Sequence, residues 1–188
     1  NIDVVLVAYD KLGHVIDFGA LEVQAVYISG NIRHPFEHYM ENPEQHHAMS
    51  WSGHEYYPRP DYLSSSRKRL APQLIYKGGI LNAWGKKMAV ALHREFYKTM
   101  PNLLEVEPEA ANLAWLIYDL QYDDESNVYQ LTHTQTVYTQ FKSALDTITT
   151  PMPGPIEAFM ENLQGKLDEQ REENNPPEAP SLADILEV

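Results

Sequence analysis

The chain of 188 residues contains no cysteine, which excludes disulfide bonds and thiolate metal sites. It has no run of about eighteen apolar residues, the length that a membrane-spanning helix needs, and no signal-peptide pattern. We therefore expect a cytoplasmic protein that does not enter a membrane. No initiator methionine precedes Asn1, which lies at the edge of a strand-like run, so we also expect further sequence ahead of it.

Apolar residues make up 43% of the chain, which also holds 12 tyrosines and 3 tryptophans. This composition is typical of a globular protein with a hydrophobic core, and the length suits one domain with an appendage. We place the domain at residues 1–165. Residues 166–188 are expected to form an acidic, proline-containing C-terminal tail.

The net charge of −13 conceals one basic segment. Residues 62–100 hold eight lysines and arginines against a single acid, Glu95, which gives this segment a charge of +7. Salt screens charges that lie further apart than about 8–10 Å, so a basic segment can bind a polyanion although the whole chain is acidic. A solvated basic helix face would show the same pattern, and charge alone leaves both interpretations open.

Hydrophobic periodicity predicts a mixed α/β fold in which helices flank a central mixed sheet. The runs at residues 2–9 and 15–28 are apolar on both faces, which is typical of strands at the centre of a covered sheet. Residues 29–66 show little periodicity, so we expect a loop there. Further strands are expected at 87–93, 111–123 and 128–139, and further helices at 67–87, 94–100, 141–148 and 155–170.

Local signals give three expectations for the long helix. Residues 64–66 are all serine and are suited to cap a helix that begins near Arg67. Pro72 is best placed in a first helical turn. Gly78 and Gly79 are expected to break or bend the helix.

Histidines are concentrated in the predicted loop. Their spacing matches no compact set of metal ligands, so a surface loop is favoured over a metal site. The histidines concerned are His34, His38, His46, His47 and His54.

Each apolar run of the hairpin holds a carboxylate where a buried strand should be apolar, Asp3 in the first run and Glu22 in the second. A buried carboxylate is costly without a cation or a donor, so each needs a partner. A two-residue loop at positions 12–13 would align Asp3 with Glu22. A type I turn with Gly13 as the bulge residue shifts the register by one, and a second bulge, for which Gly19 is suited, restores the alignment.

Aligned carboxylates would begin about 4.5–5.5 Å apart at Cβ and would need a cation between them. Mg²⁺ suits such a site because it takes oxygen ligands and retains several waters, and the carbonyl of Val23 could add a third oxygen. Gln24 would share the face of Glu22. Such a site can activate a water for attack on a phosphodiester, but Asp with Glu-x-Gln is by itself a weak signal.

Longer motifs resemble the NotI-like family of type II restriction endonucleases, which belongs to the PD-(D/E)XK nuclease superfamily. The middle block, with PQLIYKGG and WGKK, is the most specific part, and the resemblance covers roughly residues 1–165. The stretches that carry it are LEVQAVYISGN (21–31), SSRKRLAPQLIYKGGILNAWGKKMAVAL (65–92), ANLAWLIYDL (111–120) and YTQFKSALDTITTPMPG (138–154).

The resemblance implies a restriction-endonuclease-like core and a Mg²⁺-dependent enzyme that cleaves double-stranded DNA at a specific site. Cleavage of a palindrome would require a homodimer, because a two-fold pair matches the symmetry of its site. The family pattern makes Asp3, Glu22 and Gln24 the catalytic set. Asp3 and Glu22 are expected to hold the metal together with Val23.

The sequence departs from the superfamily pattern in three ways. Ile2 stands where the motif has proline. Gln24 takes the place usually held by the catalytic lysine, and because it carries no charge we expect it to orient the attacking water by hydrogen bonding. The helix that precedes the first strand in the superfamily is missing from this sequence. A catalytically silent DNA-binding or assembly module therefore remains the alternative interpretation.

DNA contacts are expected from the basic segment, because a helix start bearing arginine and lysine offers both charge and free amides to phosphates. Residues 31–61 are expected to form part of the surface that reads bases. The residues expected to contact DNA are Arg33, Arg67, Lys68, Arg69, Lys77, Lys86 and Lys87.

Overall fold

The computed structural model describes residues 2–46, 49 and 58–173, and the chain forms two compact units, Asn1–Thr150 and Pro151–Val188. The described part of the second unit contains one helix, α8 (Ile156–Glu173), as the sequence predicts. The side chains described in this unit are exposed. No helix in the described part of the chain is long and apolar enough to cross a membrane.

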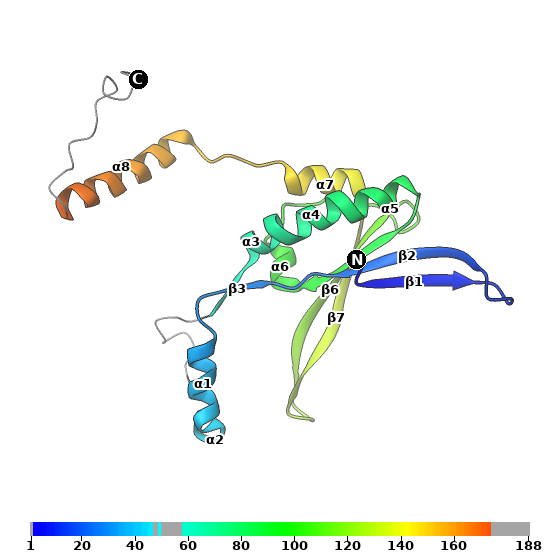
Figure 1. Ribbon diagram of the computed structural model, residues 1–188, viewed down its shortest axis with the longest axis horizontal. Helices are drawn as coiled ribbons and strands as arrows, with labels where there is room; N and C mark the ends of the chain where they lie inside the picture. Colours follow the sequence, from blue (N-terminus) through cyan, green and yellow to red (C-terminus); the bar gives the residue numbers. More distant parts are fainter. Residues whose placement is uncertain (1, 47–48, 50–57, 174–188) are drawn as a thin grey trace, which may run out of the picture. The chain divides into compact units, whose positions relative to one another are not determined.

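The first unit combines strands and helical segments (Figure 1). Its strands are β1 (Val4–Tyr9), β2 (Val15–Val23), β3 (Tyr27–Ser29), β4 (Arg59–Asp61), β5 (Met88–His93), β6 (Leu113–Asp123) and β7 (Val128–Thr139). Its helical segments are α1 (Arg33–Glu41), α2 (Pro43–His46), α3 (Tyr62–Ser65), η2 (Ser66–Leu70), α4 (Ala71–Gln73), η3 (Leu74–Gly78), α5 (Gly79–Ala83), α6 (Arg94–Lys98) and α7 (Phe141–Thr149).

The main sheet of the described residues has five strands in the order β1-β2-β5-β6-β7. Strand β5 pairs in parallel with β2 and with β6, whereas β1–β2 and β6–β7 are antiparallel hairpins. The short strands β3 and β4 pair with each other in a separate sheet. The predicted mixed α/β fold is confirmed, together with the predicted strands β5, β6 and β7 and the helices α6 and α7.

The hydrophobic core lies on one face of the main sheet. Alternate residues of β5 and β6, such as Val90 and Trp115, are buried on this face. Leu70 and Leu74 of the long helical run and Phe141 of α7 belong to the same buried cluster, and the two helical segments lie side by side in Figure 1. The period of two along the strands and the four-residue step along the helix bring these apolar side chains together.

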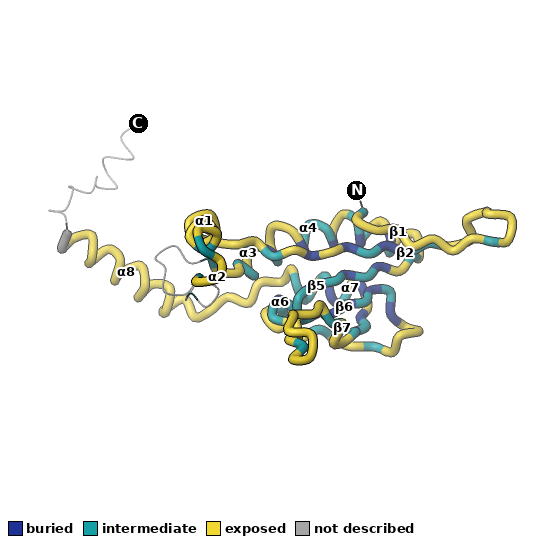
Figure 2. Tube along the Cα trace, turned by 90° about the horizontal axis from the view of Figure 1, so that it is seen from below, coloured by how far each residue is buried: buried dark blue, intermediate teal, exposed yellow. Residues whose placement is uncertain are grey.

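The prediction that both strands of the first hairpin are covered is wrong for β1. Strand β1 is an edge strand, and all six of its residues are exposed, as the colouring of Figure 2 shows. Along β2, burial begins only near Ala20 and includes Glu22. An apolar run is therefore compatible with an exposed edge strand as well as with a buried central strand, because the neighbouring elements decide whether the strand is covered.

The prediction of a loop over residues 29–66 is also wrong in part. Helices α1 and α2 occupy residues 33–46, and β4 begins at Arg59. Helix α1 buries only Pro35 and is supported locally by an ion pair of 2.7 Å between Arg33 Nε and Glu37 Oε1. Such a helix forms through i,i+4 contacts and lacks the apolar stripe on which a sequence prediction depends.

The long helical run begins earlier than predicted. Its first residue is Tyr62, and Asp61 caps it by accepting a hydrogen bond of 2.9 Å from the Ser64 backbone N–H. The prediction of a serine cap is therefore wrong. Ser65 instead links the helix to β3, since its hydroxyl accepts a 2.8 Å hydrogen bond from the Tyr27 N–H.

The same run passes through the glycine pair without a break, so the expected break is wrong, whereas Pro72 lies in the first turn of α4, as expected. Pro72 follows the wide π-type turn η2, in which the hydrogen-bonding pattern is shifted and the missing proline N–H is accommodated. Gly78 and Gly79 are both helical. A Cβ at Gly78 would lie 2.5 Å from Phe141 Cε2, so glycine permits the close approach of α7.

Candidate active site

The turn of the β1–β2 hairpin sets the register of the candidate site. Asp10 Oδ1 accepts hydrogen bonds from the Leu12 and His14 N–H groups, and Gly13 has a positive φ of 84°. This geometry belongs to a type I turn followed by a glycine bulge. These hydrogen bonds also lower the pKa of Asp10, with the His14 N–H making the largest contribution.

A second bulge restores the alignment of the two carboxylates. Tyr9 pairs with Val15, but Ala8 pairs with Asp17, so the bulge lies at Ile16. Gly19, the predicted position of this bulge, instead pairs regularly with Leu6, and the prediction is wrong at this point. A Cβ at Gly19 would lie 3.2 Å from the Lys87 carbonyl oxygen, so glycine there permits close approach of the neighbouring backbone.

The register carries Asp3 to the level of Glu22. Val4 pairs with Leu21, and one residue further out the Asp3 carboxylate accepts a hydrogen bond of 2.9 Å from the Val23 N–H. Because the N–H and C=O of one strand residue point toward the same neighbouring strand, the Val23 carbonyl is also directed toward β1. The structure thus brings Asp3 to the backbone between Glu22 and Gln24.

Glu22 is a buried carboxylate with one satisfied oxygen. Its side chain is 1% exposed, and Lys77 Nζ donates to Oε2 over 2.6 Å. The second oxygen, Oε1, is buried and has no hydrogen-bond partner. An unpaired buried carboxylate oxygen is costly, so this atom calls for a donor or a cation.

Gln24 leaves a second acceptor without a partner. It follows Glu22 by two residues, is 5% exposed, and donates from Nε2 to the Ala25 carbonyl oxygen over 2.7 Å. Its backbone N–H donates to the Ala91 carbonyl oxygen and so extends the β2–β5 pairing. The amide oxygen Oε1 is buried and has no partner. Two buried acceptors therefore share this end of β2.

Oxygen acceptors of this kind fit Mg²⁺, which prefers carboxylate, amide and carbonyl ligands and retains part of its water shell. The described residues contain no group of three or more histidine, aspartate or glutamate side chains that could hold a metal. A cation at this site would therefore depend on two carboxylates with main-chain oxygen and water. The residues that could hold it are Asp3, Glu22 and Val23.

Lys77 was expected to contact DNA, whereas the structure places its ammonium on Glu22. The contact joins residues 55 positions apart and is not visible from local spacing. One signal could have found it: Leu70, Leu74 and Leu81 form an apolar stripe at helical spacing, and Lys77 falls within that stripe. A lysine on the buried face of a helix needs a buried anion.

The other basic residues lie at several places on the first unit. Arg67, Lys68 and Arg69 are consecutive and exposed, but they lie in the second turn of the helical run, so the argument from free amides at a helix start is wrong for them. The Arg69 guanidinium lies 4.7 Å from the centre of the Tyr27 ring.

Lys86 and Lys87 follow the end of the helical run and have partners of their own. Lys86 Nζ lies 2.6 Å from Asp17 Oδ1, and this hydrogen bond holds the pKa of Asp17 below its ordinary value. Lys87 Nζ donates to the Pro108 carbonyl oxygen over 3.4 Å. Both contacts are open to solvent, so either lysine can exchange its partner for an anion.

Three of the five histidines in the predicted loop lie in helices α1 and α2. The rings of His38 and His46 stack at 4.2 Å between centroids, and His46 Nδ1 lies 2.7 Å from the His38 carbonyl oxygen. His34 is in α1. His47 and His54 lie outside the described residues.

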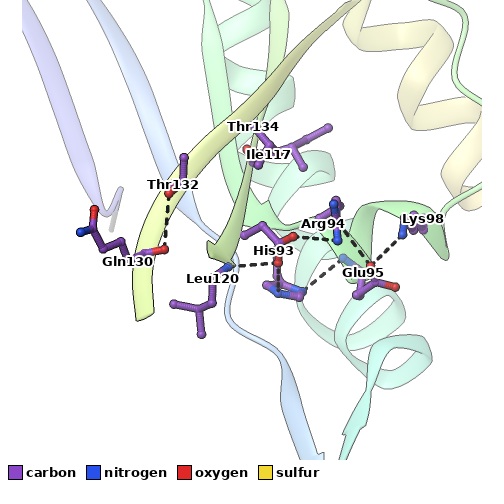
Figure 3. Close-up of polar contacts among 10 residues, drawn as sticks. His93, Arg94, Glu95, Lys98, Ile117, Leu120, Gln130, Thr132 and Thr134 are labelled. Carbon is purple, nitrogen blue, oxygen red and sulfur yellow. Dashed lines mark hydrogen bonds and ion pairs between the residues drawn. The ribbon is translucent and has the colours of Figure 1, made fainter. Parts of the chain in front are cut away.

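A polar network missed by sequence reasoning lies where β5 ends (Figure 3). Asp119 on β6 is approached by Arg94 Nη2 at 2.8 Å and by His93 Nε2 at 3.3 Å. His93 also caps α6, because its Nδ1 accepts a hydrogen bond from the Glu95 N–H. The Asp119 side chain is 14% exposed, so its contacts with Arg94 and His93 link α6 to β6 with limited access of solvent. No local sequence pattern marks the three residues as neighbours.

The chain matches the model of the protein family described as restriction endonuclease NotI over residues 1–131. The matched range includes both strands of the first hairpin, the long helical run and most of the β6–β7 hairpin. No curated protein matches the chain.

Proposed function

Because this chain belongs to the NotI restriction endonuclease family, whose members are DNA-cleaving hydrolases, we propose that it is a type II endonuclease that cleaves double-stranded DNA at a specific site. We place the active site at Asp3, Glu22 and Gln24, on a core of the PD-(D/E)XK type. The observation that carries this proposal is the pair of buried acceptors without partners, Glu22 Oε1 and Gln24 Oε1, beside a carboxylate that the hairpin register brings to the same strand end.

A divalent cation, Mg²⁺ in our proposal, would be held by the carboxylates of Asp3 and Glu22 and the Val23 carbonyl. Bound there, it would polarise a phosphoryl oxygen and make water more acidic. The parallel pairing of Glu22 with Val90 and of Val23 with Ala91 fixes the backbone of the site to the centre of the sheet. A site on such a rigid element keeps its ligands in place without reorganisation during the reaction.

Gln24 has the role of orienting water. Its Nε2 is committed to the Ala25 carbonyl, which leaves Oε1 as an acceptor turned away from that bond. An amide oxygen can accept a hydrogen bond from a water but cannot take its proton. Gln24 therefore positions a nucleophile, and replacing it should slow cleavage without abolishing it.

DNA would be held by positive side chains at several places on the first unit. The exposed triplet Arg67, Lys68 and Arg69 offers charge without a competing buried partner, and the partners of Arg33, Lys86 and Lys87 are exposed enough to be exchanged for phosphate. Phosphate contacts of this kind position the duplex, whereas base contacts set its sequence. A homodimer would place two such sites on the two strands of a palindrome.

The direct test is incubation of the purified chain with supercoiled plasmid and mixed genomic DNA, with Mg²⁺ or with EDTA. Discrete fragments that form only with Mg²⁺ are expected, and their ends give the recognition sequence. The matched variants are Glu22→Gln, which removes the charge, and Gln24→Ala. Cleavage by the Glu22→Gln protein at the rate of the unaltered chain would remove the proposed site.

A second candidate is a DNA-binding or assembly module without catalysis. It is favoured by the absence of a lysine at position 24 and by the Lys77 ammonium, which already compensates Glu22. A gel shift on the same DNA separates the two functions. Retarded DNA that stays intact with Mg²⁺, at the same protein concentrations, would support the silent module.

A further inference from the structure

Among the described residues, Lys77 forms an ion pair with one of the candidate catalytic carboxylates, Glu22. Its Nζ lies 2.6 Å from Glu22 Oε2, and its side chain is 23% exposed while that of Glu22 is 1% exposed. Ion pairs of this kind are stronger than exposed ones because the surroundings screen them less. The contact is therefore part of the site and not a surface charge pair.

Lys77 points toward Glu22 because it lies on the buried face of the long helical run. Leu74 and Leu81, which are three residues before and four residues after Lys77, are buried against the sheet. A side chain at these spacings points to the same helix face. Gly78, the next residue, lets the helix lie close to Phe141 of α7.

We propose that Lys77 is a positioning residue of the active site and supplies, from the helix, the positive charge that Gln24 cannot supply from the strand. This inference rests on the proposed endonuclease function. The ammonium occupies one oxygen of Glu22 and leaves Oε1, which has no partner, for the ligand of the site. Phosphodiester hydrolysis builds negative charge near these groups, and a fixed cation stabilises it.

The arrangement makes a specific prediction about the metal. Lys77 and a bound divalent cation share the Glu22 carboxylate, so the lysine supports the reaction while it weakens the attraction for the metal. Removing the ammonium should therefore slow cleavage and strengthen metal binding at the same time. A lysine with a merely structural role would affect both properties in the same unfavourable direction.

The test compares Lys77→Met with Lys98→Met, which removes another lysine that is ion-paired with a glutamate, at 2.8 Å, away from the site. We expect Lys77→Met to cleave plasmid about 100-fold more slowly. We expect its melting temperature to rise more with Mg²⁺ than that of the unaltered protein, because a ligand that binds the folded state stabilises it. Lys98→Met should match the unaltered protein in both measurements. Should Lys77→Met fail to fold, Lys77→Gln, which keeps a donor for Glu22 Oε2 without the charge, is judged by the same outcomes.

A rescue experiment isolates the charge. In the double variant Lys77→Met/Gln24→Lys the cation returns from the strand, and we expect cleavage to recover by about tenfold over Lys77→Met. Cleavage by Lys77→Met at the rate of the unaltered protein, or a double variant that recovers nothing, would overturn the proposal.

The failure of this inference is distinguishable from the failure of the proposed function. If the unaltered protein does not cleave DNA, the endonuclease is rejected, and Lys77 is judged by melting alone. A larger Mg²⁺ response in Lys77→Met than in the unaltered protein would still place the lysine at the cation site. An equal or smaller response would overturn it.

Discussion

Asp3 accepts a hydrogen bond from the Val23 N–H at 2.9 Å across 20 residues of sequence. The carboxylate closes the open end of the β1–β2 ladder and lies at the backbone of the residue that follows Glu22. The side chain thus has a structural role in the hairpin and, in the proposed function, a catalytic one, and two substitutions can separate them.

Asp3→Asn should abolish cleavage and leave the melting temperature nearly unchanged. The asparagine side-chain oxygen can still accept from the Val23 N–H, but it carries no charge to hold a cation. Asp3→Ala should also abolish cleavage and should lower the melting temperature, because it removes the acceptor as well. Plasmid cleavage and thermal unfolding measured on the same preparations check both. Full activity in Asp3→Asn would contradict the assignment.

The two adjacent glycines of the helical run should respond in opposite directions to alanine. A Cβ at Gly78 would lie 2.5 Å from Phe141 Cε2, whereas a Cβ at Gly79 meets nothing within 4 Å. Gly78→Ala should reduce the free energy of unfolding by about 1–3 kcal/mol through overpacking. Gly79→Ala should raise it by about 0.5–1 kcal/mol, because alanine favours the helix. Urea unfolding measures both, and equal effects would mean that Gly78 is not held against α7.

The cap at the start of the helical run should be sensitive to acid. The Ser64 N–H makes the largest contribution to lowering the pKa of Asp61 from its ordinary value of 3.8. A lowered pKa means that the cap stabilises the fold fully above the unfolded-state value and that this stabilisation is lost as the pH falls through the folded-state value. Asp61→Ala should lower the melting temperature at pH 7.

The pH series provides its own control. The difference between the unaltered protein and Asp61→Ala should shrink as the pH falls below about 3.8. Asp61→Asn, which caps without a charge, should lie close to the unaltered protein at pH 7. A difference that stays constant down to the acid transition would show that the carboxylate does not act as the cap.

Asp119 should contribute to stability and not to cleavage chemistry. It lies between the Arg94 guanidinium and the His93 ring with 14% of its side chain exposed. Asp119→Ala should lower the free energy of unfolding by about 2 kcal/mol, the scale for hydrogen bonds to a charged group. Chemical unfolding measures this loss, and Lys98→Ala on the exposed side of α6 serves as the control. An Asp119→Ala protein as stable as the control would mean that the network of Figure 3 does not fasten α6.

Much of the fold could be predicted from local patterns. The alternation of apolar residues in 88–93 and 113–117 marked strands that are buried on one face, and the turn chemistry of Asp10 and Gly13 marked the hairpin. These features depend on interactions between near neighbours, which a single sequence records directly. Helix α1 escaped prediction because local ion pairs, not an apolar stripe, support it.

The candidate site was predictable in composition but not in detail. The sequence identified Asp3, Glu22 and Gln24 as candidates, because polar groups in an apolar hairpin are costly to bury without partners. The position of the second bulge was not predictable, because Gly19 is accounted for by the close approach of the Lys87 carbonyl and the bulge lies at Ile16 instead. The prediction that β1 is covered was wrong for a related reason. An edge strand and a central strand can have the same apolar sequence and differ only in how many neighbouring strands and helices cover them.

The sequence by itself determined the secondary-structure periods, the hairpin turn and the set of polar groups that a fold of this kind must satisfy, because these depend on residues a few positions apart. The tertiary structure alone decided that Lys77 neutralises Glu22 across 55 residues and that Asp119 joins α6 to β6. Long-range pairs of this kind form only when packing brings distant elements together, and no local pattern encodes the distance between two charges.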